Sequence, residues 1–358
     1  MDPQMPKRSQ TMCLPQMQWR ELDEAEAERR VLAGENLFIC GIAGTGKSHL
    51  CLSLVEKLRS LKRRVDIIAK THTASARATG VTADHYVRRS VLHGCCHADC
   101  VWVEECFQIE TSLWAQLNKL NVQWILSGDE AQFPPVFDSW RSCAVEEGQL
   151  SASRMFHRMA GGNRLMLRTC RRSDSFLFNF YSSLIKGGCR FQLPLNAVLA
   201  EARGLFNYEG ICRNNLCISH AKRIRVNREI NLALKPDDAL YIKAAPVKGQ
   251  ANAAQSMFIW EGIQLLGCAS YKKIRNNVLY TVTKIDDDSI TVDEEIKLTF
   301  PQVQHFLRLS FARTYASCQG TEFSDELRLH CTNNRHFTLR HLFVGSSRCK
   351  DRRLLAIT

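Results

Sequence analysis

The residues with the clearest chemical potential are 41–48, which read GIAGTGKS and follow an apolar run at 37–40. They fit the pattern G-x-x-x-x-G-K-[S/T], in which glycines let consecutive backbone N–H groups converge on phosphate oxygens. Lys47 would reach the β- and γ-phosphates, and the hydroxyl of Ser48 would ligate Mg²⁺. The loop therefore predicts a nucleoside triphosphate and Mg²⁺ as ligands, bound by Gly41, Gly44, Thr45, Gly46, Lys47 and Ser48.

Two carboxylates, Glu104 and Glu105, directly follow the apolar residues 101–103. Since the carboxyl ends of parallel strands meet at one edge of a sheet, this pair is expected beside the phosphate loop. Glu104 is predicted to hold Mg²⁺ or its water shell, and Glu105 to orient and deprotonate the attacking water. The predicted chemistry is therefore hydrolysis of the bound nucleotide.

A third polar group, Gln132, follows the next apolar run, 122–126, within the stretch GDEAQFPPV at 128–136. Its amide can hydrogen-bond to the γ-phosphate and so respond to the presence of that phosphate. The adjoining Phe133 and Pro134 offer a rigid apolar surface on which a nucleic-acid base can stack. The stretch therefore connects the predicted nucleotide site with a surface for nucleic acid.

Alternating apolar runs and helical patterns must position these groups, and they are typical of a parallel sheet covered by helices. In the first half, strands are expected at 37–40, 65–69, 101–103 and 122–126, with helices at 19–32 and 47–61. In a second series, strands are expected at 164–167, 216–219, 306–311 and 353–357, with helices at 173–185, 222–234 and 338–346. Within that series, 241–298 alternates with a period of two, which indicates a small β-rich insertion. The fold class is therefore α/β, with two domains.

The excess of basic over acidic residues indicates what kind of partner the protein binds. The 358 residues include 48 Lys and Arg against 36 Asp and Glu, a formal net charge of +12, and the pI is near 9.1. Such a surplus favours a polyanion, because each phosphate that is neutralised releases condensed counterions. We therefore expect a nucleic acid as partner.

The number and spacing of the cysteines indicate whether the protein is secreted or stays inside the cell. Sixteen are scattered along the chain, without a signal-peptide pattern and without a run of apolar residues that could span a membrane. We expect reduced thiols in an intracellular protein, nuclear or cytoplasmic, with no membrane partner. His93, Cys95, Cys96, His97 and Cys100 lie close enough in the chain for a zinc site, but the absence of a second ligand pair favours a cysteine-rich surface turn.

These motifs, in this order, resemble those of the superfamily 1 helicases that move 5′ to 3′, the RecD and petite-integration-frequency (Pif) group. The resemblance covers residues 37–355, most of the chain. Besides GIAGTGKS and GDEAQFPPV, it rests on AKTHTASARATG at 69–80, VTADHYV at 81–87, LRTCRRSD at 167–174, LCISHAKRIRVN at 216–227, FARTYASCQGTEF at 311–323 and FVGSSRCKD at 343–351.

The resemblance implies two RecA-like P-loop NTPase domains with an SH3-like β-rich insertion in the second. The expected boundaries are 1–165 for the first domain, 166–240 with 299–358 for the second, and 241–298 for the insertion. The implied activity is that of an ATP-dependent DNA helicase or translocase, which moves 5′ to 3′ on single-stranded DNA and hydrolyses ATP with Mg²⁺ in the cleft between the domains. The processes of this group are DNA replication, recombination and repair.

The resemblance also assigns residues. Arg171, with Arg172 as second choice, is the implied arginine finger, and Arg348 is a second catalytic arginine. Gly320 is implied in nucleotide binding. The residues implied in nucleic-acid binding are His72, Thr73, Thr82, His85, Phe133, Pro134, Ser219, His220, Thr314 and Gln319.

The chain departs from the group's pattern in its second motif, which is normally Asp-Glu and here is Glu104-Glu105. The extra methylene shifts a carboxylate against the octahedral demand of Mg²⁺ and predicts slower hydrolysis. Ala316, Ser317 and Cys318 stand where the group has His, Lys and Ser. No glutamine in 19–35 matches the one that reads adenine, and the first-domain insertion is reduced to 88–100.

Two alternatives follow from these departures. One is a nucleotide-regulated NTPase that binds single strands with weak or no unwinding. The other is a viral-type superfamily 1 RNA helicase, so RNA stays open as a partner, and the 2′-hydroxyl would discriminate between the two. The oligomeric state is left open, and a monomer is compatible with the motifs.

Overall fold

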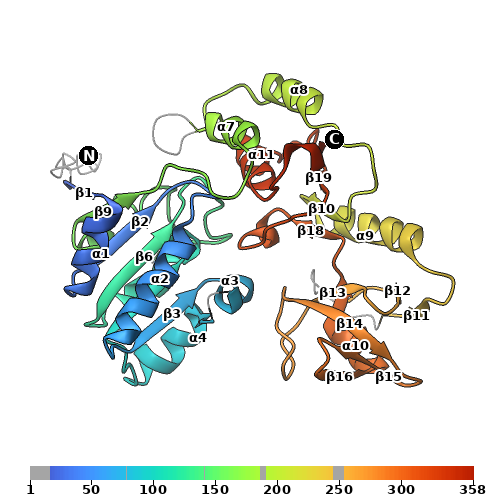
Figure 1. Ribbon diagram of the computed structural model, residues 1–358, viewed down its shortest axis with the longest axis horizontal. Coiled ribbons are helices and arrows are strands. Elements are labelled where there is room, and N and C mark those ends of the chain that lie inside the picture. The colour runs from blue at the N-terminus through green and yellow to red at the C-terminus, as the bar shows by residue number, and fades with distance from the viewer. Residues whose placement is uncertain (1–16, 78, 141, 186–190, 245–253) are drawn as a thin grey trace, which may run out of the picture.

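The computed structural model describes residues 17–358 except 78, 141, 186–190 and 245–253 (Figure 1). In its first domain, the described residues form a seven-stranded sheet in the order β1-β9-β2-β6-β5-β3-β4, with all pairs parallel. The strands are β1 (Arg20–Leu22), β2 (Leu37–Cys40), β3 (Val65–Ala69), β4 (Val81–Thr82), β5 (Cys100–Glu104), β6 (Gln123–Gly128) and β9 (Asn163–Met166).

Both faces of this sheet are buried, which explains why its central strands are apolar at successive positions. Ile39, Ile67 and Trp102 pack on one face against α2, whereas Phe38 and Val103 pack on the other. The helices of this domain are α1 (Glu24–Leu32), α2 (Lys47–Ser60), α3 (His72–Arg77), α4 (Ala83–Tyr86), α5 (Thr111–Leu117) and α6 (Arg154–Met159), with a π-helix η1 (Val87–Leu92), a 3₁₀ turn η2 (Cys106–Gln108) and a hairpin of β7 (Ser139–Trp140) and β8 (Cys143–Ala144).

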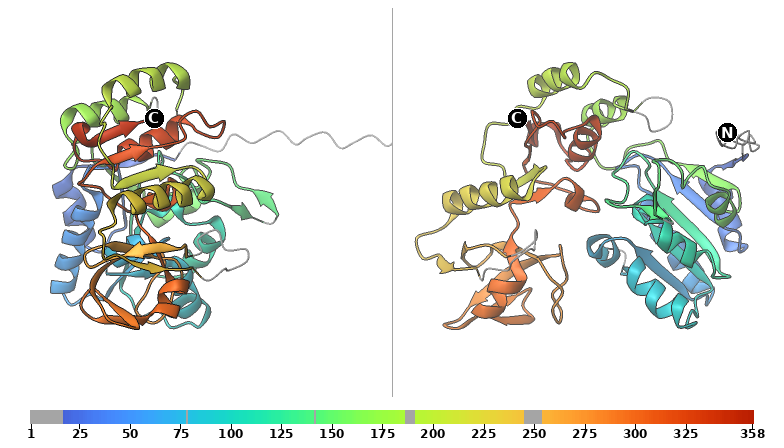
Figure 2. Two further views of the ribbon diagram at one scale, coloured as in Figure 1. Left: turned by 90° about the vertical axis from the view of Figure 1, so that its right-hand side faces the viewer. Right: turned by 180° about the vertical axis from the view of Figure 1, so that it is seen from behind.

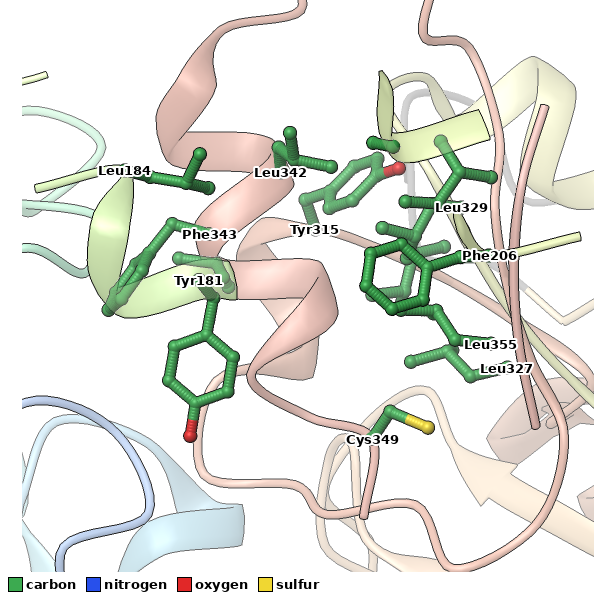
Figure 3. Packing of buried hydrophobic residues seen from close by; sticks show 14 of the residues in the cluster. Tyr181, Leu184, Phe206, Tyr315, Leu327, Leu329, Leu342, Phe343, Cys349 and Leu355 are labelled. Carbon is green, nitrogen blue, oxygen red and sulfur yellow. The ribbon is translucent and has the colours of Figure 1, made fainter. Parts of the chain in front are cut away.

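The second domain is built on a parallel sheet with the order β18-β10-β19-β20 within the described chain. Its strands are β10 (Asn214–Cys217), β18 (Ala312–Thr314), β19 (Leu327–Leu329) and β20 (Leu355–Ile357), and its helices are α7 (Ser175–Ser183), α8 (Leu195–Leu205), α9 (His220–Leu234) and α11 (Leu339–Ser346), with 3₁₀ turns η3 (Ala316–Cys318) and η4 (Arg352–Leu354). Figure 3 shows its core, where side chains of α7 and α11 meet those of the sheet.

A β-rich part follows α9 in the chain. Its five-stranded sheet, in the order β16-β15-β14-β13-β17, is antiparallel, and α10 (Phe300–Phe306) precedes its last strand. The strands are β13 (Gln264–Gly267), β14 (Leu279–Ile285), β15 (Ser289–Val292), β16 (Ile296–Thr299) and β17 (Leu307–Leu309), beside a separate pair of β11 (Leu240–Ile242) and β12 (Met257–Ile259). Seen from behind, this part lies below the second sheet and across from α3 (Figure 2). The predicted fold class is confirmed.

Three expectations for individual elements were wrong. The helix expected at 19–32 begins only at Glu24, because the Asp23 carboxylate caps it by accepting from Glu26 N–H at 2.8 Å, and the residues before it form β1. The strand expected at 164–167 as the start of the second series is β9, which lies between β1 and β2 in the first sheet. The strand expected at 306–311 in the second series is β17, which pairs with β13 in the β-rich part, and the strand of the second sheet, β18, begins only at Ala312.

Candidate nucleotide site

The phosphate loop connects β2 to α2 as expected, and its shape depends on glycine. Gly41 has a φ of +150°, and a Cβ there would lie 2.5 Å from the carbonyl oxygen of Leu167. Lys47 folds back over the loop and donates to the carbonyl oxygens of Gly41 at 2.6 Å and Ile42 at 3.1 Å. Loss of water around it lowers the pKa of Lys47, while the carboxylates of Asp129 and Glu104 oppose that shift. The ammonium group is thus placed at the loop that binds phosphates in such folds.

Glu104, at the end of β5, is held by two hydroxyl groups. Its Oε1 accepts from Ser48 Oγ at 2.5 Å, and its Oε2 accepts from Ser127 Oγ at 2.6 Å. The indole N–H of Trp102 donates to the same Ser127 oxygen at 2.9 Å, which fixes the hydroxyl. The longer glutamate therefore reaches the serine of α2 directly, in the place where the helicase pattern has aspartate.

This donor set fits the magnesium ion implied by the phosphate-loop pattern. A hydroxyl and a carboxylate lie side by side, and Mg²⁺ typically takes one or two such protein oxygens and completes its shell with water and phosphate. Among the described residues, no group of three or more His, Cys, Asp and Glu side chains is placed to hold a metal by itself. Ser48 and Glu104 are the residues that would hold the ion.

A cavity of about 310 Å³ opens in front of these groups and is lined from both domains. Glu105 and Gln132 line it as predicted. The Gln132 side chain is buried, and its Oε1 has no hydrogen-bond partner in the described part of the chain. Its Nε2 lies 3.5 Å from Asp129. The amide oxygen is thus available to a ligand in the cavity.

The second domain supplies arginines to the opposite wall. Arg348 is 2% exposed, and its Nε donates to the carbonyl oxygen of Val344 at 3.3 Å. Its Nη2 is buried without a hydrogen-bond partner among the residues that the structure describes. A buried guanidinium N–H without an acceptor is costly unless an anion binds, so Arg348 faces the cavity in the way a phosphate-binding arginine does.

The two candidates for the arginine finger, Arg171 and Arg172, differ in how far their side chains are buried. The Arg172 side chain is 13% exposed, pairs with Glu322 at 2.6 Å and donates to the carbonyl oxygen of Ser347 at 3.1 Å. The Arg171 side chain is 59% exposed and lies 3.6 Å from Glu24 of α1. Both line the cavity, and the second choice, Arg172, lies deeper. The choice between them stays a prediction.

Thr45 and Gly320, also predicted to bind the nucleotide, are not among the residues that line the cavity. Thr45 is buried and donates to the carbonyl oxygen of Ile42 at 2.9 Å. Gly320 has a φ of +74°, and a Cβ there would lie 3.5 Å from Ala74 of α3, away from the cavity lining. Several lining residues were not predicted. Asp129 carried a signal in the sequence, because it directly follows β6. The other polar ones are His49, Gln108, Ser127, Glu322 and Lys350.

The predicted nucleic-acid residues of the first domain lie at α3 and α4. Burial lowers the pKa of His72, and the positive charges of Arg275 and His85 lower it further. Arg275 belongs to the β-rich part, so basic groups of two domains face each other here. Thr82 caps α4 by accepting from His85 N–H at 3.4 Å. Thr73 lies in α3, and its side chain falls outside the described residues.

The loop at 133–134 differs from a free stacking surface. Phe133 is partly buried, and its ring packs edge-on against His341 of α11 with 4.8 Å between centroids. Pro134 is exposed, as are the following Val136 and Phe137. Phe133 thus joins the two domains, and the exposed apolar surface lies just after it.

Of the predicted second-domain residues, Ser219 and Thr314 bond to neighbours, whereas Nδ1 of His220 is buried without a hydrogen-bond partner in the described chain. Ser219 caps α9 by accepting from Lys222 N–H at 3.2 Å, and burial lowers the pKa of the adjacent His220. The hydroxyls of Thr314 and Ser317 lie 3.0 Å apart and bond to each other.

Gln319 is 6% exposed and reaches across the cleft. Its Nε2 donates to the carbonyl oxygen of Phe133 at 3.3 Å. This side chain contacts the first domain, so its role in nucleic-acid binding stays a prediction.

The described cysteines are all free thiols, and Cys95 is exposed in the turn that was considered for zinc. No helix in the described ranges is long and apolar enough to cross a membrane.

The sequence and fold of this chain are similar to those of known helicases. Residues 37–156 match the viral superfamily 1 RNA helicase core domain. No curated protein matches the chain by sequence. Among solved structures, the Pif1 helicase from Candida albicans has a TM-score of 0.67 at 16% identity, covering 93% of each chain. Bacteroides Pif1 bound to single-stranded DNA has 0.67 at 18%, and Bacteroides Pif1 with ADP-AlF3 and single-stranded DNA has 0.66 at 16%, each covering 93% of this chain and 91% of the other. The chain therefore has the Pif1 helicase fold, which confirms the resemblance seen in the motifs.

Proposed function

We propose that this protein is an ATP-dependent DNA helicase or translocase that moves 5′ to 3′ on single-stranded DNA. One observation carries the proposal: the phosphate loop, Glu104 and Gln132 of the first domain face Arg172 and Arg348 of the second across one cavity. A nucleotide in such a cavity contacts both domains at once. Its hydrolysis can therefore change their spacing, which is what a motor requires.

The residues of the chain divide the chemistry between them. Lys47 and the loop N–H groups bind the β- and γ-phosphates, and Glu105 orients and deprotonates the attacking water. Arg348 and one of the pair Arg171 and Arg172 stabilise the charge that develops on the γ-phosphate. Ser48 and Glu104 hold Mg²⁺, which neutralises phosphate charge when it is bound.

Movement follows from loss of the γ-phosphate. A strand that lies across both domains is gripped alternately as the cleft closes and opens. The surface at His72 and His85, opposite Arg275, and the net charge of +12 favour a phosphate backbone as the bound group. The single-stranded DNA in the Bacteroides Pif1 structures supports DNA as the polymer. The 5′ to 3′ direction is proposed from the resemblance of the motifs to that group. We place the activity inside the cell, in the nucleus or the cytoplasm.

Two other functions have specific observations in their favour. The match of residues 37–156 to the viral RNA helicase core favours RNA as the substrate. The mutual hydrogen bond of Thr314 and Ser317 favours a nucleotide-regulated binding protein with weak or no unwinding, because these hydroxyls are engaged with each other.

The test is the rate of ATP hydrolysis without nucleic acid, with a single-stranded DNA oligonucleotide, and with RNA of the same sequence. Lys47→Ala is the control for contaminating ATPases. Stimulation by DNA that disappears in Lys47→Ala supports the proposal. Stronger stimulation by RNA would instead support a viral-type RNA helicase. A hydrolysis rate that neither polymer changes would support the nucleotide-regulated binding protein.

Direction and unwinding need a second assay. Duplexes with either a 5′ or a 3′ single-stranded tail would be offered with ATP, and strand separation followed. Unwinding of the 5′-tailed duplex alone is expected. Unwinding of the 3′-tailed duplex alone would contradict the proposed 5′ to 3′ direction but would still support helicase activity.

A further inference from the structure

Tyr181 of α7 is completely buried in the core of the second domain, yet its hydroxyl leaves that core. The ring packs edge-on against Phe178 and Phe343, with centroids 5.4 and 5.8 Å apart. Figure 3 shows the oxygen directed away from the other aromatic rings, toward the blue ribbon of the first domain. There it donates to the carbonyl oxygen of Ala43 at 3.1 Å. A second-domain side chain therefore binds the phosphate loop itself.

The same hydroxyl lies against the segment that carries the arginine pair. It is 3.5 Å from Ser173 Oγ and 3.7 Å from Cys170 Sγ. The segment is also joined to the loop, because the N–H of Arg171 donates to the carbonyl oxygen of Gly44 at 2.8 Å. A Cβ at Gly44 would lie 3.1 Å from the Tyr181 oxygen and 3.2 Å from Arg172 Cβ, so the packing leaves no room for a side chain there.

The far side of this segment is tied to the second domain. Ser173 Oγ donates to the carbonyl oxygen of Cys349 at 2.8 Å, and the N–H of Asp174 donates to that of Lys350 at 2.9 Å. Both acceptors directly follow Arg348. The phosphate loop, the Arg171-Arg172 pair and the Arg348 loop are thus connected through a few hydrogen bonds, with the Tyr181 hydroxyl at the centre.

We infer that Tyr181 is a positioning residue, which sets the arginines of the second domain against the phosphate loop through its bond to Ala43. The hydroxyl lines no part of the cavity and so acts through the loop and the arginines. Burial raises the pKa of Tyr181, which keeps the hydroxyl protonated as a donor at neutral pH. The functional consequence rests on the proposed ATP hydrolysis, whereas the structural link does not.

The chain offers a matched control. Tyr181→Phe keeps the ring in the core and removes only the oxygen. Tyr315→Phe does the same for a ring in the same core, whose hydroxyl donates to the carbonyl oxygen of His330 at 3.0 Å, away from the phosphate loop. Each change removes one buried hydrogen bond to a backbone carbonyl, so a general loss of stability affects both variants alike.

The kinetic arm compares ATP hydrolysis in the two variants. A misplaced arginine weakens an interaction made mainly in the transition state, so kcat should fall in Tyr181→Phe while KM for ATP stays within about twofold. We expect a loss of about three- to tenfold, the size that one neutral hydrogen bond supports. Equal kcat values in the two variants would overturn the inference.

The second arm needs no catalysis and uses hydrogen–deuterium exchange of the protein without nucleotide. Peptides covering 41–48 and 168–174 should exchange faster in Tyr181→Phe than in Tyr315→Phe, since the amide of Arg171 loses its support at Gly44. Unchanged exchange would overturn the inference by itself. Inactivity of the wild-type enzyme together with faster exchange would reject the proposed hydrolysis and keep the positioning role.

Discussion

The phosphate loop at 41–48 and the segment at 314–320 are both glycine-containing turns that follow a parallel strand, and they use their polar groups in opposite ways. Around the first, side chains converge on a cavity, and the buried polar atoms of Gln132 and Arg348 lack partners among the described residues. In the second, Thr314 and Ser317 bond to each other, and Gln319 bonds to the other domain.

The polar groups of a motif therefore indicate a binding site where the fold leaves them without partners. A buried donor or acceptor without a partner carries an energetic cost that a ligand can remove, whereas groups that satisfy each other gain little from a ligand. The nucleotide site of this protein is of the first kind. The segment at 314–320 is of the second kind, and the following experiments test that contrast.

The largest expected effect concerns Arg348. Arg348→Ala should lower kcat for ATP hydrolysis by about a thousandfold, because it removes a buried cation from the developing charge. Nucleotide affinity, measured by titration with a fluorescent ATP analogue, should change far less. Arg353→Ala is the control, since the side chain of Arg353 is 81% exposed and pairs with Asp351. A nearly normal kcat in Arg348→Ala would contradict the placement of this arginine at the site.

The second prediction concerns the unusual second motif. Glu104→Asp should lower the hydrolysis rate by about ten- to hundredfold, because the shorter side chain retreats from both Ser48 and Ser127. The helicase pattern alone, with aspartate here, predicts a faster enzyme instead. Steady-state ATPase assays over a Mg²⁺ titration decide between them, and a gain in rate would show that the glutamate strains the site.

A smaller effect is expected where the second-domain surface is engaged with itself. Ser317→Lys breaks the bond to Thr314 and adds a cation where the group has lysine. Affinity for single-stranded DNA should rise about three- to tenfold, and the plot of log affinity against log salt should steepen by about 0.7. Fluorescence anisotropy over a salt series measures both, with the exposed Ser183→Lys as the charge-matched control. An equal gain in both variants would mean that charge alone, and not this segment, sets the affinity.

The smallest effect concerns acid stability. Burial lowers the pKa of His330 and of His341 to about 4 in the folded protein. The unfolded chain, with pKa near 6.5, binds more protons between these values, so stability is full above pH 6.5 and decreases as pH falls toward 4. Both residues belong to the second domain, which should therefore unfold first in acid.

Thermal unfolding followed between pH 7.5 and pH 4.5 measures this loss. The double variant His330→Gln, His341→Gln should flatten the dependence of Tm on pH, whatever its Tm at neutral pH. A dependence as steep as that of the wild type would show that other groups control acid unfolding.

The sequence predicted β2 and β3 to the residue, because a strand buried on both faces is a short apolar run that ends at turn residues. β9 was placed in the wrong series because its partner β1 lies far away in the chain, and Asn163 and Arg164 hide its apolar pattern. Pairing between distant segments leaves no local signal, so the order of the strands was not available from the pattern.

Contacts between distant segments were equally hard to predict at the candidate nucleotide site. The loop and the carboxylates could be found because their spacing is fixed within one turn. The pairing of Arg172 with Glu322, the contact of Gln319 with Phe133, and the bond from Tyr181 to Ala43 depend on how the two domains pack. Residue types at these positions carried no hint of their partners.

The position of β9 also has a mechanical consequence. It lies beside β2, which feeds the phosphate loop, and the chain leaves the first domain directly after it. The chain therefore crosses between the two domains close to the phosphate loop, whereas the β-rich part lies far from this crossing (Figure 1). A rotation of the second domain about this crossing would displace the β-rich part, where it faces α3, more than the residues near the phosphate loop.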